Sequence, residues 1–276
     1  MGIKTPFVSE IAKDTYAINE FGLSAMYLII GEEKALLLDA GCGVCDLAGL
    51  VSSLTDKPVM LALTHAHGDH IGGAGAFDNV YVGKGDEWPD DAAPEAVFDA
   101  EHMRGYVENL GKQGSYDVYD ISPEMVKPWP KTPKAVVLND GDEIDLGGRK
   151  LLCIAVSGHT PGGMCFLDES TRILFSGDAC NTNLLTFRNP VHETLAALRY
   201  LDTFTGRYDQ MWNGHIGYAG KPEALSQPKT TLPDLIHICE SILSGEAKPK
   251  EFPFLGRVQY AVEYGVSRIS YNPENL

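Results

Sequence analysis

Four side chains that can bind a metal ion, His65, His67, Asp69 and His70, lie in the segment HAHGDH. Imidazole nitrogens and carboxylate oxygens both bind zinc readily. In an extended segment alternate residues point to the same side, so His65 and His67 can hold one ion. Gly68 lets the backbone turn, which directs Asp69 and His70 towards a second ion. Because three of only eight histidines fall here beside an aspartate, the spacing indicates a metal site.

Three further candidate ligands follow later in the chain, and each stands beside a glycine after an apolar run. They are His159 in SGHTPGG, Asp178 in FSGD and His215 in WNGH. Each is a weak signal alone, because a single histidine is more often structural. With the first four they make seven ligands, the number that two metal ions need if a carboxylate and a hydroxide bridge them. The sequence therefore predicts a binuclear centre.

The cysteines and one other histidine carry weaker signals. Cys42 and Cys45 form a C-x-x-C match, which is typical of a redox pair or of half a zinc knuckle. No second C-x-x-C follows and the pattern around a thioredoxin motif is missing, so free thiols are expected. Cys180 is expected to be a packed thiol rather than a ligand. His102 is interpreted as structural, although residues on insertions can reach a functional site.

Buried strands must position the ligands, because loops at the ends of core strands are where a rigid scaffold presents reactive side chains. Short apolar runs precede the ligand loops, at 59–63 before the first cluster, 173–175 before Asp178 and 209–212 before His215. Helices are expected over 44–54, 95–111, 190–203 and 231–243, and a short helix is expected to open within 71–77. The alternation over 258–271, with Gly265 in its middle, predicts a closing hairpin.

The segment from Gly83 to Lys134 has a different character, because prolines, acidic residues and aromatic residues mix in it. It is interpreted as an insertion on the core. The predicted organisation is a catalytic domain over 1–220 with a cap insertion at about 83–134. A C-terminal helix and hairpin over 221–276 are expected to pack on the same domain. The insertion and the segment after Tyr218 are expected to form the walls of the substrate pocket.

The order of the ligands resembles that of the metallo-beta-lactamase superfamily, and within it the branch of glyoxalase II thioesterases and N-acyl-homoserine lactonases. The matching features are the H-x-H-x-D-H motif, the later histidine, aspartate and histidine, and the early Asp39-Ala40-Gly41. The resemblance runs from about Tyr16 to His215. It implies an α/β fold, an αββα sandwich of two mixed sheets packed face to face with outer helices.

The resemblance also assigns the metal ligands. The first ion would be held by His65, His67 and His159, the second by Asp69, His70 and His215, and Asp178 would bridge both. The chain departs from compact members in the longer gap between His70 and His159, and in Ile216-Gly217-Tyr218 after the last histidine. Both departures affect the expected substrate, and neither affects the ligands.

By this resemblance the protein is a zinc-dependent hydrolase that cleaves an ester, thioester or lactone carbonyl of a small molecule. The expected nucleophile is a hydroxide bridging two Zn2+ ions, since metal binding lowers the pKa of water from about 15.7 to about 7. Asp69 is expected to orient the hydroxide and relay a proton, and Tyr218 to donate to a developing oxyanion. Iron and manganese are the alternative metals. The alternative functions are a mononuclear iron sulfur dioxygenase and a non-catalytic metal-binding sensor of the same fold.

Composition narrows the choice of partners. The formal net charge of −16 would repel nucleic acid, and no basic cluster offsets it. No run of about 18 apolar residues is present to form a transmembrane helix, and the N-terminus does not resemble a signal peptide. We therefore expect a cytoplasmic enzyme that acts on a small molecule, with neither nucleic acid nor membrane as a partner. A homodimer is compatible with these features, which do not specify the oligomeric state.

Overall fold

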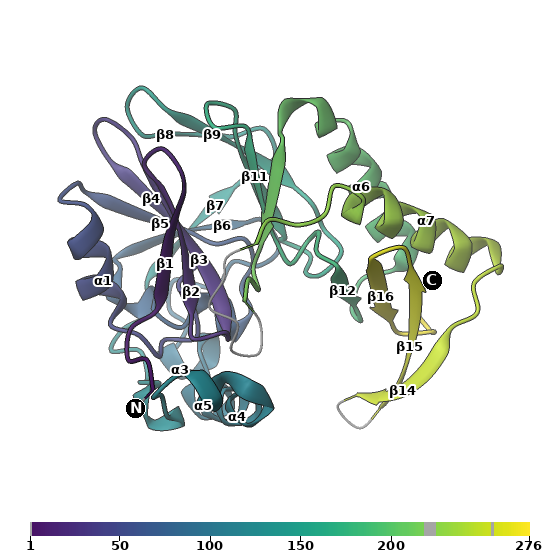
Figure 1. The fold of residues 1–276 in the computed structure, drawn as a ribbon, viewed down its shortest axis with the longest axis horizontal. Helices are drawn as coiled ribbons and strands as arrows, with labels where there is room; N and C mark the ends of the chain where they lie inside the picture. The colour runs from purple at the N-terminus through teal and green to yellow at the C-terminus, as the bar shows by residue number, and fades with distance from the viewer. Residues whose placement is uncertain (1, 218–224, 255–256) are drawn as a thin grey trace.

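Two mixed β-sheets form the centre of the molecule (Figure 1). The computed structural model describes residues 2–217, 225–254 and 257–276. The first sheet has the strand order β1 (Phe7–Ala12), β2 (Thr15–Glu20), β3 (Ser24–Ile30), β4 (Ala35–Leu38), β5 (Val59–Ala62), β6 (Asn79–Gly83) and β7 (Lys134–Leu138). The second has the order β13 (Gln210–Asn213), β11 (Ile173–Gly177), β10 (Met164–Asp168), β9 (Lys150–Ala155) and β8 (Glu143–Asp145).

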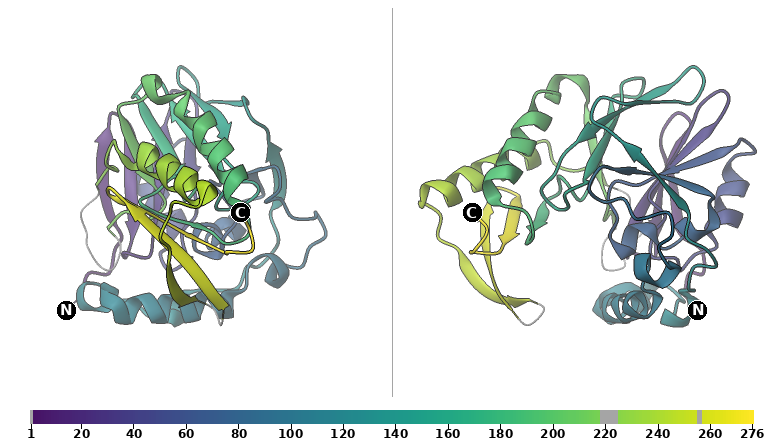
Figure 2. Two further views of the ribbon diagram at one scale, coloured as in Figure 1. Left: turned by 90° about the vertical axis from the view of Figure 1, so that its right-hand side faces the viewer. Right: turned by 180° about the vertical axis from the view of Figure 1, so that it is seen from behind.

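Helices cover the outer face of each sheet. The first sheet carries α1 (Leu47–Leu54), the insertion helices α3 (Pro94–Val97), α4 (Ala100–Leu110) and α5 (Tyr116–Val118), and the short α2 (Gly68–Ile71). The second sheet carries α6 (Val191–Asp202) and α7 (Thr231–Ser244). Short 3-10 or π segments span Ala74–Ala76, Gly111–Ser115, Pro123–Met125 and Thr205–Arg207. The rear view in Figure 2 shows the insertion helices on one side of the molecule and the C-terminal elements on the other.

The strand β3 shows why the sheets stack in this way. Its side chains alternate, so Met26 and Leu28 join the core beneath α1 and the insertion, whereas Tyr27 and Ile29 join the core between the sheets. All four side chains are at most 1% exposed. A strand that is apolar on both faces must be covered on both faces. The predicted αββα sandwich is therefore present.

A third sheet was not predicted. The hairpin expected over 258–271 is present as β15 (Arg257–Tyr264) and β16 (Ser267–Tyr271). Beyond the expectation, β15 also pairs with β14 (Lys250–Phe254), and β16 pairs in parallel with β12 (Asn183–Thr186). The C-terminal segment is thus joined by backbone hydrogen bonds to β12, which lies between β11 and α6 in the sequence.

Two helix predictions differ from the structure in their boundaries. The short helix near the metal motif begins at Gly68, so Asp69 and His70 lie inside it rather than before it. The helix expected over 95–111 is divided into α3 and α4. Asp99 causes the division, because its side chain accepts a hydrogen bond from the His102 amide at 2.9 Å and caps a new helix there.

Arg149, in the turn between β8 and β9, forms hydrogen bonds to both sheets. Its Nε donates to Asp168 Oδ2 at 3.0 Å, and its Nη1 donates to the carbonyl oxygens of Asp14 at 3.1 Å and Ile30 at 3.2 Å. The Arg149 side chain is 9% exposed and that of Asp168 is fully buried. Removing one partner of a buried ion pair leaves an uncompensated charge in the interior.

We expect Arg149→Met to lower the free energy of unfolding by about 3–5 kcal/mol at neutral pH. Burial alone would raise the pKa of the Asp168 carboxyl, but hydrogen bonds from Arg149, Ser170 and Thr171 outweigh it and hold that pKa below its ordinary value. A lowered carboxyl pKa stabilises the folded state above the unfolded pKa of about 3.9, and this contribution is lost as the pH falls. Urea unfolding at pH 7 and pH 3 should therefore show a gap between variant and wild type that narrows in acid.

The matched control is Lys150→Met, at the next position, because the Lys150 side chain is exposed and its ion pairs with Glu143 and Asp145 lie at the surface. A midpoint of unfolding that is the same for Arg149→Met and Lys150→Met would contradict a structural role for the buried pair.

None of the helices in the described part of the chain has the length and apolar character that a membrane span requires.

Candidate metal centre

The structure brings together all seven residues that the sequence singles out. The loop after β5 carries two of them and α2 the next two, while the others follow β9, β11 and β13: His65, His67, Asp69, His70, His159, Asp178 and His215. Because β11 and β13 are parallel neighbours, with Gly177 opposite Asn213, their following loops leave the sheet at the same edge. Four loops from both halves of the sandwich therefore meet at one place.

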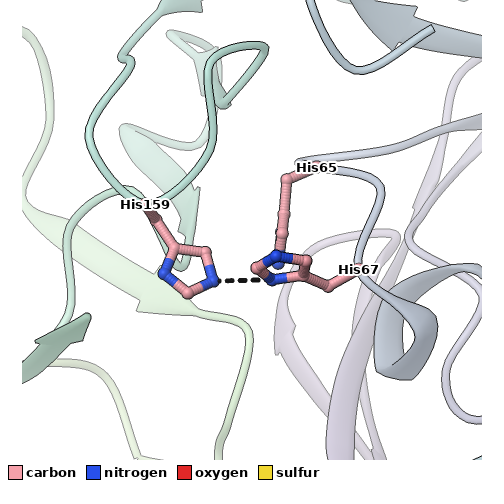
Figure 3. Close-up of side chains that lie close together, drawn as sticks. All are labelled: His65, His67 and His159. Atoms are coloured by element: carbon pink, nitrogen blue, oxygen red, sulfur yellow. Dashed lines mark hydrogen bonds between the residues drawn. The ribbon is translucent and has the colours of Figure 1, made fainter. Parts of the chain in front are cut away.

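Three imidazoles form the first group, in which the potential ligand atoms lie within 4.8 Å of one another: His65, His67 and His159. Figure 3 shows His65 and His67 on one loop facing His159 on another, with His67 Nδ1 and His159 Nε2 at 2.9 Å. The Nδ1 atoms of His159 and His65 face away from the group. His159 Nδ1 lies 2.7 Å from the Leu185 carbonyl oxygen, and His65 Nδ1 lies 3.1 Å from Thr64 Oγ1. Such outer contacts orient an imidazole so that its remaining nitrogen faces a metal.

A carboxylate and two imidazoles form the second group, with the same limit of 4.8 Å: Asp69, His70 and His215. Asp69 Oδ2 lies 3.6 Å from His70 Nε2 and 3.5 Å from His215 Nε2. The outer nitrogens are again held, because His70 Nδ1 lies 2.9 Å from Asp39 Oδ2 and His215 Nδ1 lies 3.1 Å from the Leu23 carbonyl oxygen. The two groups are thus built in the same way.

Asp178 lies between the two groups. Its Oδ2 is 3.0 Å from His215 Nε2, 3.9 Å from His70 Nε2 and 3.7 Å from His159 Nε2. It also forms a potential ligand set with His65 and His70, one residue from each group. A carboxylate in this position can contact cations held by either group.

Three buried atoms of this cluster lack a hydrogen-bond partner. Among the described residues, His65 Nε2, His70 Nε2 and Asp178 Oδ1 are enclosed and unpaired. An unsatisfied buried polar group costs about 1–3 kcal/mol, so native structures rarely leave several together. Imidazole nitrogen and carboxylate oxygen are suitable ligands for zinc and similar divalent ions. The donor atoms present therefore fit bound divalent metal.

The electrostatics differ between the two groups. Burial lowers the pKa of His65 well below its ordinary value, and burial together with the neighbouring His159 lowers that of His67 to about 4. Burial alone would lower the pKa of His70 as well, but Asp69 and Asp39 outweigh it and raise this pKa to about 10. His65 and His67 thus favour the neutral imidazole, the form that binds metal, and the second group places the Asp69 carboxylate where a cation would be stabilised.

Asp39 orients the ligand loop through three contacts of its carboxylate. Its Oδ1 accepts from the Thr64 amide at 2.7 Å, and its Oδ2 accepts from Thr64 Oγ1 at 2.8 Å while it also contacts His70. Asp39 itself adopts a φ of +62°, which is uncommon outside glycine. A single carboxylate thereby fixes both the strand end before His65 and the ring of His70.

Asp86 was missed by the sequence reasoning. Its Oδ2 accepts from the Ala66 amide at 3.0 Å and from Thr160 Oγ1 at 2.7 Å, and its Oδ1 accepts from the Gly162 amide at 2.8 Å. One side chain at the start of the insertion thus joins the loop of His65 and His67 to the loop of His159. In the sequence it is one acidic residue among several, and no local pattern distinguishes it.

The C-x-x-C segment has a structural explanation that was also missed. The fully buried Glu20 carboxylate accepts from the backbone amides of Val44 at 2.8 Å and Cys45 at 3.0 Å, and also from that of Cys42. Burial raises the pKa of both thiols well above the ordinary value. Thiols of this kind are poor nucleophiles and poor metal ligands. Cys180 is likewise a packed thiol, because burial raises its pKa to about 12.

Two other residues considered from the sequence are not part of this cluster. His102 is exposed on α4, and no potential ligand set among the described residues includes it. Tyr218 lies outside the described residues. A different tyrosine reaches the cluster, because the Tyr106 hydroxyl on α4 donates to Asp69 Oδ2 at 3.1 Å. The insertion therefore contacts the candidate metal centre directly.

Comparisons with known proteins identify the family. Residues 19–222 match the model of the metallo-beta-lactamase superfamily. The chain is 28% identical over 173 residues to the acyl-coenzyme A thioesterase MBLAC2 of Homo sapiens, which covers 55% of this chain and 57% of that protein. It is 26% identical over 196 residues to a probable metallo-hydrolase of Streptococcus pyogenes, covering 68% of this chain and 73% of that protein.

Solved structures share the fold. A metallo-beta-lactamase from Pontibacter korlensis superposes with a TM-score of 0.56 and 16% sequence identity, covering 86% of this chain and 99% of that chain. A family protein from Thermus thermophilus superposes with a TM-score of 0.53 and 18% identity, covering 87% of this chain and 85% of that chain. The chain spans only a little more than half the length of the thioesterase relatives that it matches, at 57%.

Proposed function

Because the chain belongs to the metallo-beta-lactamase superfamily, we propose that it is a binuclear metallohydrolase whose substrate is a small thioester. The observation that carries the proposal is the set of unpaired buried donors, His65 Nε2, His70 Nε2 and Asp178 Oδ1, where the two ligand groups meet. The choice of a thioester among the carbonyl bonds that such a centre could cleave is supported by the similarity to acyl-coenzyme A thioesterases.

The proposed ligand assignment follows the two groups. One zinc ion would be held by His65, His67 and His159 and a second by Asp69, His70 and His215, with Asp178 placed to contact either ion. Iron and manganese accept similar ligands. When bound, a metal pair supplies Lewis-acid polarisation of a carbonyl oxygen and a water molecule of lowered pKa.

Asp69 is the proposed catalytic carboxylate. Burial alone would raise its pKa, but His70 and His215 outweigh burial and hold the pKa below its ordinary value, so the group is ionised at neutral pH. An ionised carboxylate can orient the attacking water and accept its proton. A thiolate is a good leaving group because thiols have a pKa of about 8.5. Thioester cleavage therefore needs little proton donation from a site whose carboxyls are ionised.

The net charge of the chain bears on which thioester it takes. A formal charge of −16 repels polyanions at low ionic strength. We therefore propose a thioester of a small, weakly charged thiol rather than a highly phosphorylated one. The insertion 83–134 forms one wall of the proposed site, since Tyr106 and Asp86 contact its loops.

The test is turnover by zinc-loaded protein of three matched acetyl compounds, a neutral alkyl thioester, acetyl-coenzyme A and an alkyl ester, and of a lactone as the fourth compound. We expect the neutral thioester to give the highest kcat/KM, in the range of about 10⁴–10⁸ M⁻¹s⁻¹ typical of enzymes. The kcat/KM for acetyl-coenzyme A should approach that for the neutral thioester as the salt concentration is raised, because salt screens the repulsion between charges. The measurement is release of free thiol or acid at 20 and 200 mM salt.

Two results would contradict the proposal. Oxygen uptake with oxidation of a thiol, and no hydrolysis, would indicate an iron dioxygenase. No turnover of any of the four compounds by protein that holds both metal ions would indicate a non-catalytic sensor.

A further inference from the structure

The structure assigns a positioning role to Tyr106: we propose that its hydroxyl fixes Asp69 as a ligand and so couples the insertion to the second metal ion. The inference rests on the proposed function in one respect, because it takes Asp69 as a ligand. Tyr106 belongs to no sequence motif, and it stands 37 residues from Asp69 along the chain. Its contact with Asp69 depends on the fold of the insertion.

The argument begins with the packing of α4. Met103, Val107 and Leu110 follow a helical spacing and are at most 3% exposed, so they form the face of α4 that joins the core under the first sheet. Tyr106 lies on the same side of the helix and is half-buried against this core. The packing of the whole helix on the core therefore determines the direction of the Tyr106 ring.

The helix α4 packs directly against α2, which carries Asp69 and His70. A side chain added at Gly68 would meet the methyl group of Met103 at 2.7 Å, which shows how closely α4 approaches the start of α2. One turn along α4, the Tyr106 hydroxyl donates to Asp69 Oδ2 at 3.1 Å. Two adjacent contacts thus join α4 to the two residues that open α2.

The oxygen that Tyr106 contacts is the one that faces the other ligands. Asp69 Oδ2 lies 3.5 Å from His215 Nε2 and 3.6 Å from His70 Nε2. A carboxylate oxygen has two lone pairs, so one can accept from the tyrosine while the other faces a cation. Without the hydroxyl, the short Asp69 side chain is free to rotate away from His70 and His215. The hydrogen bond thereby orders the ligand before metal arrives.

The test is Tyr106→Phe, which keeps the ring that packs in the core and removes only the hydroxyl. The matched control is Tyr116→Phe, because the Tyr116 hydroxyl makes a comparable bond within the insertion, to Glu108 Oε2 at 2.8 Å, away from the ligands. Metal-free protein is titrated with Co2+, and the visible absorption bands of each bound equivalent are recorded. Loss of a residue that orients a ligand typically weakens metal binding by about 10–100-fold.

We expect Tyr106→Phe to weaken one of the two Co2+ equivalents by that factor and to alter its absorption bands, with the other equivalent unchanged. Tyr116→Phe should titrate like the wild type, and thermal melting should show that both variants are folded. If the wild type binds two Co2+ ions and Tyr106→Phe binds both equally well with the same spectrum, the inference is wrong while the proposed function stands. A wild-type protein that binds a single ion would overturn the binuclear centre as well.

Discussion

Replacing Asp69 with asparagine is expected to lower kcat by about 10²–10⁴-fold, the contribution of a positioned general acid or base. Asparagine has nearly the same shape, but its amide cannot accept the proton of the attacking water. It also removes one negative charge between His70 and His215, at the oxygen that lies 3.5 Å from His215 Nε2. The measurement is steady-state hydrolysis of the neutral thioester by protein whose metal content has been determined in parallel.

The matched control is Asp117→Asn, because Asp117 is an exposed aspartate on α5 of the insertion. It should leave kcat unchanged. If Asp69 also passes a proton to the leaving group, the loss should be greater for an alkyl ester than for a thioester, since an alkoxide is a much poorer leaving group than a thiolate of pKa about 8.5. A variant that holds both metal ions and keeps a near wild-type kcat would show that Asp69 has no catalytic role.

Removing the metal is expected to abolish activity and to lower the melting temperature. Without a bound metal ion, His65 Nε2, His70 Nε2 and Asp178 Oδ1 stay buried without a hydrogen-bond partner. An ion that binds only the folded protein stabilises it by about 2.7 kcal/mol when present at 100 times its Kd. Dialysis against a chelator, followed by a thiol-release assay and a thermal melt, measures both effects.

Zinc added back should restore activity and melting temperature together. Magnesium is the control, since it prefers oxygen ligands and fits imidazole-rich sites poorly. Full activity after complete removal of metal would contradict the proposed chemistry.

The central sandwich and the residues that meet in the candidate centre could be predicted because local constraints determine them. Metal chemistry restricts residue types and spacing in HAHGDH, and the largely apolar strands β3 and β4 need cover on both faces. His159, Asp178 and His215 were individually weak signals that gained weight only as a set. The structure brings them together with the first cluster, and their role as ligands remains a prediction for experiment.

The remaining features depend on contacts between distant segments, which leave no local pattern. The pairing of β12 with β16 joins residues more than 80 positions apart. Asp86 and Glu20 act through hydrogen bonds to backbone amides, and any sequence can supply an amide. Tyr106 is one of 12 tyrosines, and only the seating of α4 places it beside Asp69.

The central claim, a binuclear centre that hydrolyses a thioester, is tested most directly by titrating metal-free protein with zinc while activity is measured. We predict that elemental analysis gives two zinc ions per chain at saturation, and that hydrolysis reaches its maximum only as the second ion binds. This follows from two ligand groups with Asp178 between them. A stable content of one zinc ion per chain with full activity would contradict the account.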